Sequence, residues 1–211
     1  MRNLPGHARL VLASANPKKV EELRAILRKA IPGFREETVV GLKDVGMPSP
    51  IEDGVTFEEN SVLKARAVAQ ATGLPAVADD SGIIVDVLGK APGVFSARWA
   101  GSHGDDVANL ELLLDQLADV PDHHRHARFV CAATLVTPDG ASHTETGEVE
   151  GVLLRSPRGE NGFGYDPIFQ PHGYSRSMAE LTPSEKHAIS HRGKALRGLT
   201  DEIAAAVSRP V

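Results

Sequence analysis

The chain has 211 residues, which is enough for one domain with a substantial core or for two smaller lobes. Its formal net charge is -5 and its Lys and Arg residues are scattered, which disfavours a protein that coats nucleic acid. A single cysteine, Cys131, excludes an intramolecular disulfide, and no apolar run is long enough to span a membrane. We therefore expect a protein of the reducing cytoplasm with a small-molecule partner. Residues 1–8 are expected to form a short N-terminal tail.

The apolar pattern alternates between strand-like and helix-like segments, which predicts an α/β fold. Residues 8–14 are expected to form a buried strand that leads into a helix with Asn16 as N-cap and Pro17 at its first position. A second helix is expected over 56–73, with a capping box of Thr56 and Glu59 and a closing Gly73.

A third helix is expected from Asp105 to Ala118. The apolar residues expected to line up along it are Val107, Leu110, Leu113, Leu114 and Leu117. Residues 125–137 and 141–154 predict an antiparallel hairpin around a "PDG" turn, which makes the sheet mixed. A last helix is expected to carry residues 184–207.

The junction "SANPKK", residues 14–19, has the features of an anion site. The start of a helix offers free N–H groups and a positive dipole end, and Ser14, Asn16 and Lys19 lie beside it. An ordinary N-cap with a surface lysine explains the same residues. Neither a Walker loop nor a "GxGxxG" motif occurs in the chain.

Two adjacent acids, Asp79 and Asp80, follow the apolar run 74–78, and we expect them at the end of a buried strand. Neighbouring side chains of a strand face opposite sides, so one carboxylate is expected to be chemical and the other structural. An acidic turn before Gly82 is the alternative. The spacing Asp-x-Asp of a haloacid-dehalogenase-like phosphatase is absent.

A further acid, Glu52, precedes the second helix, on which Asn60 and Lys64 share a face. Carboxylates from Glu52 and Asp80 would suit a hard cation such as Mg²⁺, which takes one or two protein carboxylates together with phosphate oxygens and water. A solvated helix face with a Glu-rich first turn is the alternative reading of this segment.

Residues 159–167, "GENGFGYDP", are too rich in glycine for regular structure, and Phe163 offers a flat face to a purine. A plain connecting loop is the alternative, and it would explain the glycines but not the aromatic residues. Further along, Lys186, Ser190 and Arg192 recur at near-helical spacing beside His191. These side chains suit a phosphate and a base edge, whereas surface decoration of a helix is the alternative.

Six motifs occur in one order and cover almost the whole chain: "SANPKK", "TFEENSVLKA", "ADDSG", "KAPGVFSARWAG", "GFGYDPIF" and "ELTPSEKHAISHRGKAL". Together they closely resemble the inosine/xanthosine triphosphate pyrophosphatase family, the Ham1-like house-cleaning enzymes. The resemblance implies one two-lobed α/β domain over 9–211, with a long mixed sheet flanked by helices, a central substrate cleft and usually a homodimer. It implies Mg²⁺-dependent hydrolysis of ITP, dITP or XTP to the monophosphate and pyrophosphate.

The resemblance also implies roles for individual residues. Asp80 would be the general base and, with Glu52, a ligand of Mg²⁺, although members often carry two adjacent acids where this chain has Ile51 and Glu52. Lys19, Lys64 and Lys186 would stabilise the pyrophosphate leaving group. The implied substrate-binding residues are Ser14, Ala15, Asn16, Pro17, Lys18, Lys19, Lys64, Ser81, Phe163, Gly164, Tyr165, Asp166, Lys186, His191 and Arg192.

Two other functions fit parts of the pattern. A Maf-like pyrophosphatase would share the fold and the bond cleaved but would prefer pyrimidine or modified nucleotides, and it gives no reason for "GFGYDP" with "SHR". A non-catalytic nucleotide-binding regulator would need no water-activating acid, so the retained Asp80 and Glu52 argue against it.

Overall fold

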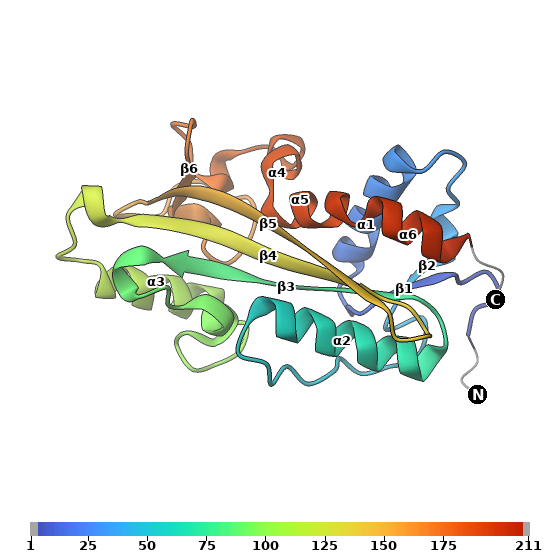
Figure 1. Cartoon of the computed structure of the whole chain (residues 1–211). Coiled ribbons are helices and arrows are strands. Elements are labelled where there is room, and N and C mark those ends of the chain that lie inside the picture. Colours follow the sequence, from blue (N-terminus) through green and yellow to red (C-terminus); the bar gives the residue numbers. More distant parts are fainter. Residues whose placement is uncertain (1–3, 209–211) are drawn as a thin grey trace. The chain divides into compact units, whose positions relative to one another are not determined.

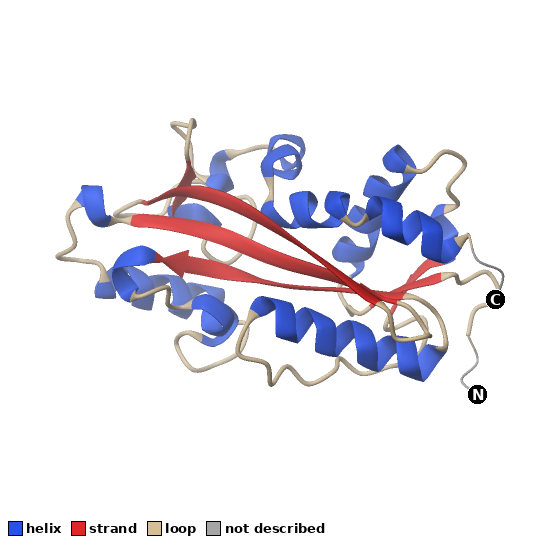
Figure 2. Ribbon diagram, viewed as in Figure 1, coloured by secondary structure: helices blue, strands red, loops and turns tan. Residues whose placement is uncertain are grey.

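The computed structural model describes residues 4–208, so the ends of the predicted tail and domain, 1–3 and 209–211, lie outside the described residues. Within that range six strands form one sheet in the order β2-β1-β3-β4-β5-β6 (Figure 2). The strands are β1 (Leu10–Leu12), β2 (Val39–Gly41), β3 (Ala76–Val85), β4 (His126–Val136), β5 (Ser142–Leu153) and β6 (Phe169–Pro171). Because β1 runs parallel to β2 and β3 while β5 runs antiparallel to β6, the predicted mixed sheet is confirmed.

The α-helices flank this sheet (Figure 1). They are α1 (Pro17–Ala30), α2 (Phe57–Thr72), α3 (Asp106–Gln116), α4 (Pro183–Ile189), α5 (His191–Gly198) and α6 (Thr200–Val207). The predicted boundaries of α1 and α2 are confirmed: Asn16 caps α1 through the Lys18 N–H, and Gly73 closes α2 in the left-handed region, at φ 70°. The α/β fold predicted from the sequence is therefore confirmed.

The start of α2 differs from the predicted capping box in one bond. Thr56 accepts the Glu59 N–H as expected, at 3.1 Å. The Glu59 carboxylate, however, accepts the N–H of Val55, one residue earlier than the capping residue, at 2.7 Å. The side chain thereby fastens the preceding loop to the helix.

Two expectations for the other helices were wrong. Val107 is 66% exposed, whereas Leu110, Leu113 and Leu117 are buried, so the apolar face of α3 begins one turn later than predicted. The single last helix is divided into α4, α5 and α6. Ser190 has an extended ψ of 141°, and its hydroxyl accepts the Gly193 N–H of α5, so this serine ends one helix and caps the next.

The predicted end of a strand at Asp79 and Asp80 was also wrong, because β3 continues through both residues as far as Val85. The residue types of "DDSG" favour a turn locally, but pairing within the sheet outweighs this preference. Both acids are therefore mounted in the middle of a ten-residue strand.

The described residues divide into two compact units, and neither is a continuous segment. Unit 1 contains 4–80, 132–146 and 194–208, and unit 2 contains 81–131 and 147–193. In unit 1, α2 lies on one face of the strands, and α1 and α6 lie on the opposite face (Figure 1). Val11 of β1 and Ala13, just after this strand, pack in one apolar cluster with Ala65 and Val68 of α2, together with Leu4 from the predicted tail.

The core of unit 2 gathers one face of β3 with α3 and the loops that follow β5. Ile83 and Val85 alternate on the strand and pack in the same cluster as Leu113 of α3 and Phe169 of β6. The buried Arg125 donates to the carbonyl oxygens of Leu117, Leu153 and Leu154, at 2.6 to 2.9 Å. The guanidinium thereby ties the end of α3 to the end of β5.

Two global features concern the environment of the chain. Cys131 is buried and is not part of a disulfide. Among residues 4–208, no helix combines the length and the apolar composition that crossing a membrane requires.

Candidate active site

The predicted site residues fall into two groups, one in each unit, and the first begins at the junction of β1 and α1. Ser14 accepts the Asn16 N–H at 3.1 Å, and Asn16 accepts the Lys18 N–H at 2.9 Å. These bonds build the expected N-cap, and the side chains of Asn16 and Lys18 are exposed. Ala15 and Pro17 are also exposed, so this helix start presents its backbone at the surface.

Asp79 is held from the α1 side of the sheet by Lys19. The two side chains form an ion pair of 2.9 Å, in which the Asp79 side chain is 3% exposed and that of Lys19 is 25% exposed. The acid therefore fixes the position of an ammonium group that still reaches the surface. Through this contact Asp79 has a structural role, which is to position Lys19.

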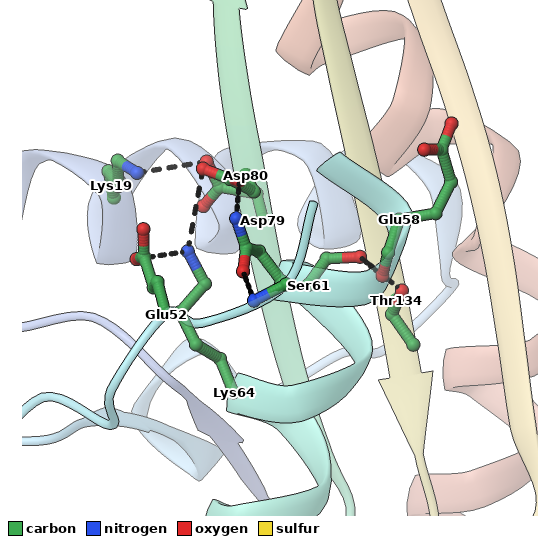
Figure 3. Close-up of polar contacts among 10 residues, drawn as sticks. Lys19, Glu52, Glu58, Ser61, Lys64, Asp79, Asp80 and Thr134 are labelled. Carbon is green, nitrogen blue, oxygen red and sulfur yellow. Dashed lines mark hydrogen bonds and ion pairs between the residues drawn. The ribbon is translucent and has the colours of Figure 1, made fainter. Parts of the chain in front are cut away.

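Asp80 is held from the opposite face by α2 (Figure 3). Asn60 donates through Nδ2 to Asp80 Oδ2 at 3.0 Å, and Lys64 Nζ lies 3.7 Å from Asp80 Oδ1. The same Lys64 Nζ donates to Glu52 Oε1 at 2.7 Å. The carboxylates of Glu52 and Asp80 thus converge on one cationic group, as a shared metal site would require.

The second group surrounds the glycine-rich loop of unit 2, which is irregular as predicted up to Tyr165. Asp166 is buried, accepts the Phe163 N–H at 2.8 Å, and forms an ion pair with Lys186 of α4. Lys186 Nζ also lies 4.9 Å from the centre of the Phe163 ring. Gly162 has φ +84°, and a Cβ there would lie 2.2 Å from Asp166 Oδ2, so the tight loop requires glycine at this position.

Phe163 and Tyr165 have opposite environments within this loop. Phe163 is 66% exposed, which leaves its ring surface open to a flat ligand. Tyr165 is buried and donates its hydroxyl to the Ser96 carbonyl at 2.8 Å. Burial, with a smaller contribution from the Asp106 charge, raises the pKa of Tyr165 well above its usual value. Tyr165 therefore anchors the loop that presents Phe163.

The basic residues after this loop lie on α4 and α5. Lys186 follows Glu185, whose pKa is lowered to about 2, first by hydrogen bonding to Arg176 and then by the Thr182 N–H. His191 stacks on Phe129, with ring centres 5.0 Å apart and an interplanar angle of 11°. Arg192 follows His191 at the start of α5.

Ser81, the remaining predicted site residue, is half-buried in β3.

Two contributors to these groups were missing from the set of predicted site residues. Asn60 was noted only as a neighbour of Lys64, and Asp106 of α3 accepts the Gly164 N–H at 2.9 Å. A polar side chain at helical spacing between the buried apolar residues Phe57 and Val68 was a signal that could have singled out Asn60. No local signal marks Asp106, because its partner is 58 residues away.

Comparisons with known proteins show the family of the chain. The model of the Ham1 family matches residues 10–202, and the chain therefore belongs to the Ham1 family. It is 58% identical to a dITP/XTP pyrophosphatase of Streptomyces coelicolor, over 90% of this chain and 94% of that protein.

Two solved structures are similar along nearly their whole length. A nucleoside-triphosphatase, dITP/XTP pyrophosphatase, of Mycobacterium abscessus is 51% identical with a TM-score of 0.76, over 90% of this chain and 98% of that one. A HAM1 protein of Coxiella burnetii is 41% identical with a TM-score of 0.85, over 94% of this chain and all of that one. The names of the Streptomyces coelicolor and Mycobacterium abscessus proteins describe hydrolases of nucleoside triphosphates.

Proposed function

We propose that the chain hydrolyses non-canonical purine nucleoside triphosphates, namely ITP, dITP and XTP, to the monophosphate and pyrophosphate. The names of its relatives support the substrate class. The observation that carries the proposal is the convergence of Glu52 and Asp80 on the single ammonium of Lys64. Two acids and a lysine in this arrangement suit a cation and a polyphosphate.

Mg²⁺ is the cation that we propose for this site. Glu52 and Asp80 would hold it, because carboxylate oxygens are the ligands that Mg²⁺ prefers and because both acids already face one positive charge. Within residues 4–208 no group of three or more His, Cys, Asp or Glu side chains is arranged to bind a metal. Phosphate oxygens and water would therefore complete the coordination. A bound Mg²⁺ would neutralise phosphate charge and make an attacking water more acidic.

Asp80 is the group that we assign to the attacking water. It is held on one oxygen by Asn60 and approached on the other by Lys64, and its side chain keeps 14% of its surface exposed. A carboxylate in this state can orient a water or take its proton for in-line attack at the α-phosphorus. Lys19, Lys64 and Lys186 would stabilise the leaving pyrophosphate. Each of these lysines forms an ion pair with a different carboxylate, which holds its ammonium group in place.

Three residues of unit 2, Phe163, His191 and Arg192, are assigned to the nucleoside. The exposed ring of Phe163 would stack on the purine, and the donors of His191 and Arg192 would bond to the 6-keto oxygen. Asp166 would keep the Phe163 backbone in place for the purine and Lys186 in place for the pyrophosphate. Ser81, next to Asp80 in β3, is assigned to the substrate as well.

The reaction is tested by a panel of triphosphates with identification of the products. Phosphorus NMR should show pyrophosphate and monophosphate, and in ¹⁸O-labelled water the label should enter the monophosphate. Orthophosphate released stepwise with a diphosphate intermediate would indicate an ordinary phosphatase. A preference for dUTP or TTP would indicate a Maf-like enzyme, and binding without turnover would indicate a regulator. We also propose a cytoplasmic homodimer, to be tested by sedimentation and by fractionation.

A further inference from the structure

Asn60 is a buried polar residue of α2 whose side chain is hydrogen-bonded both to Asp80 and to the loop that contains Glu52. Its side chain is almost fully buried, with 1% of the residue exposed. The amide nitrogen donates to Asp80 Oδ2 at 3.0 Å, and the amide oxygen accepts the Gly54 N–H at 2.9 Å. One planar group therefore links the middle of β3 to the loop that precedes α2.

An amide suits this position because it carries a donor at one end and an acceptor at the other. Ionised aspartate could accept the Gly54 N–H but could not donate to Asp80, and it would add a like charge beside that acid. Lys64 lies one helical turn after Asn60 and approaches the other oxygen of Asp80, at 3.7 Å. Each oxygen of Asp80 thus has its own partner on the same face of α2.

The loop end of this link is equally constrained. Gly54 is two residues from Glu52, and a Cβ at Gly54 would lie 2.7 Å from Asn60 Oδ1 and 2.8 Å from Glu59 Cβ. Such distances leave no room for a side chain, so the loop backbone is pressed directly onto the first turn of α2. The Val55 N–H, bound to Glu59 at 2.7 Å, strengthens the same attachment.

The rotation of α2 at this point is fixed by the neighbouring Ser61 (Figure 3). Its hydroxyl lies 2.6 Å from the Thr134 hydroxyl of β4 and donates to the Glu58 carbonyl at 2.9 Å. Thr134 in turn lies 2.8 Å from the Thr144 hydroxyl of β5. A chain of hydroxyls, buried at Ser61 and Thr134, therefore holds the first turn of α2 against the strands, one residue away from Asn60.

We infer that Asn60 is a positioning residue that sets the carboxylates of Asp80 and Glu52 relative to each other for one divalent cation. The inference rests on the proposed function, in which these two acids share the cation. Asn60 itself does not touch the substrate. Its part is to hold one acid by a direct hydrogen bond and the other through the backbone of the Gly54 loop.

Two variants break the link at different ends. Asn60→Ala removes both hydrogen bonds, and Gly54→Ala leaves every proposed ligand intact while pushing the loop away from Asn60. The matched control is Asn109→Ala in unit 2. Asn109 is also a helical asparagine with 1% exposure that accepts one loop N–H, that of Ala100, at 2.7 Å. It therefore reproduces the cost of losing a buried amide without altering the link.

Three quantities are measured for each protein: the affinity for Mn²⁺ alone by electron paramagnetic resonance, the Mg²⁺ concentration for half-maximal turnover of dITP, and the melting temperature. Outer ligand contacts of this kind are worth about 10- to 100-fold in metal affinity or activity. We expect both link variants to bind Mn²⁺ about tenfold more weakly and to need about tenfold more Mg²⁺, at a lower kcat. Asn109→Ala should lower the melting temperature and leave both metal values unchanged.

Folded link variants with the Mn²⁺ affinity of the parent would overturn the inference, as would an equal metal defect in Asn109→Ala. If Asn60→Ala does not fold, the Mn²⁺ affinity of Gly54→Ala alone tests the inference. The Mn²⁺ measurement requires no turnover, so it separates the two ideas. A parent protein that binds Mn²⁺ in an Asn60-dependent way but hydrolyses neither dITP nor XTP keeps the inference and refutes the proposed function. A parent that binds no Mn²⁺ refutes the inference.

Discussion

Asp79 and Asp80 are consecutive residues of β3, yet they are bound from opposite faces of the sheet, Asp79 by Lys19 of α1 and Asp80 by Asn60 of α2. The alternation of a strand produces this separation. The buried acid positions a lysine, and the more exposed acid is the one that we propose to meet water and a cation. Substitution of each acid is therefore expected to have a different effect.

Asp80→Asn should fold normally, bind nucleotide and lose most of its turnover, because an amide cannot take a proton from water. Asp79→Asn should instead lower the free energy of unfolding by about 1–3 kcal/mol, since the buried negative charge that pairs with Lys19 is lost. Urea unfolding and kcat with dITP measure the two effects. Near-normal turnover in folded Asp80→Asn would contradict its assignment as general base.

Removal of divalent cations should abolish activity, and added Mg²⁺ should restore it. Glu52→Gln should raise the Mg²⁺ concentration needed for half-maximal turnover, because one of the two carboxylate ligands is lost. Glu58→Gln, an exposed acid in the first turn of α2, is the matched control and should behave like the parent. Full turnover in excess chelator would remove the metal from the mechanism.

ITP and XTP should exceed ATP in kcat/KM, because the amino group of adenine would face the donors of His191 or Arg192. An unpaired buried donor costs about 1–3 kcal/mol, so one mismatch gives roughly ten- to hundredfold discrimination. GTP should be disfavoured by its 2-amino group. His191→Ala should reduce the preference over ATP, as measured by competition between the two triphosphates. Equal hydrolysis of ATP or GTP and ITP by the parent would contradict the assignment.

Phe163→Ala should raise KM for every purine by a similar factor, because stacking does not distinguish the substituents of the ring. The exposure of Phe163 means that the fold loses little from the change. Phe129→Ala serves as the contrast, since that ring is buried in the core of unit 2 and its loss should lower the melting temperature. A KM change confined to one purine would show that Phe163 reads substituents.

Glu185 provides a test of pH dependence near the proposed nucleoside residues. Its pKa is lowered to about 2, chiefly by the hydrogen bond from Arg176 at 2.7 Å, so its ionised form stabilises the folded state. That stabilisation is complete above the ordinary pKa of 4.5 and is lost as the pH falls toward 2. The difference in unfolding free energy between the parent and Glu185→Gln should therefore be constant from pH 7 to about pH 5.5 and shrink below it. A difference that does not change with pH would contradict this assignment.

The helix boundaries predicted from the sequence depended on local signals, and this explains which of them were correct. Asn16, Thr56 and Gly73 act on backbone groups within a few residues, so their positions in the sequence were sufficient. Ser190 is also a capping residue, but it lies within a segment whose apolar residues recur at helical spacing. That spacing led to the prediction of one continuous helix, and the break at Ser190 was missed. The extension of β3 through Asp79 depended on neighbouring strands, which local residue types do not reveal.

The candidate site shows the same limit at a longer range. The sequence and the resemblance together nominated Glu52, Lys64 and Asp80, and the structure brings these three residues together. The contact of Lys19 with Asp79 joins residues 60 positions apart, and that of Asp106 with Gly164 joins residues 58 apart. Pairings of this kind are decided by how the chain folds back on itself, and no local pattern encodes them.

The division of the chain into units has a consequence for synthesis on the ribosome. The chain passes from one unit to the other after residues 80, 131, 146 and 193. Residues 4–80 emerge first, but Ile203 and Ala206 of α6, which are buried in the finished protein, emerge among the last residues of unit 1. Unit 2 has all of its residues once position 193 has left the exit tunnel. Unit 1, which begins to emerge first, is therefore the last to complete its fold. Part of its apolar surface stays uncovered until α6 has been translated.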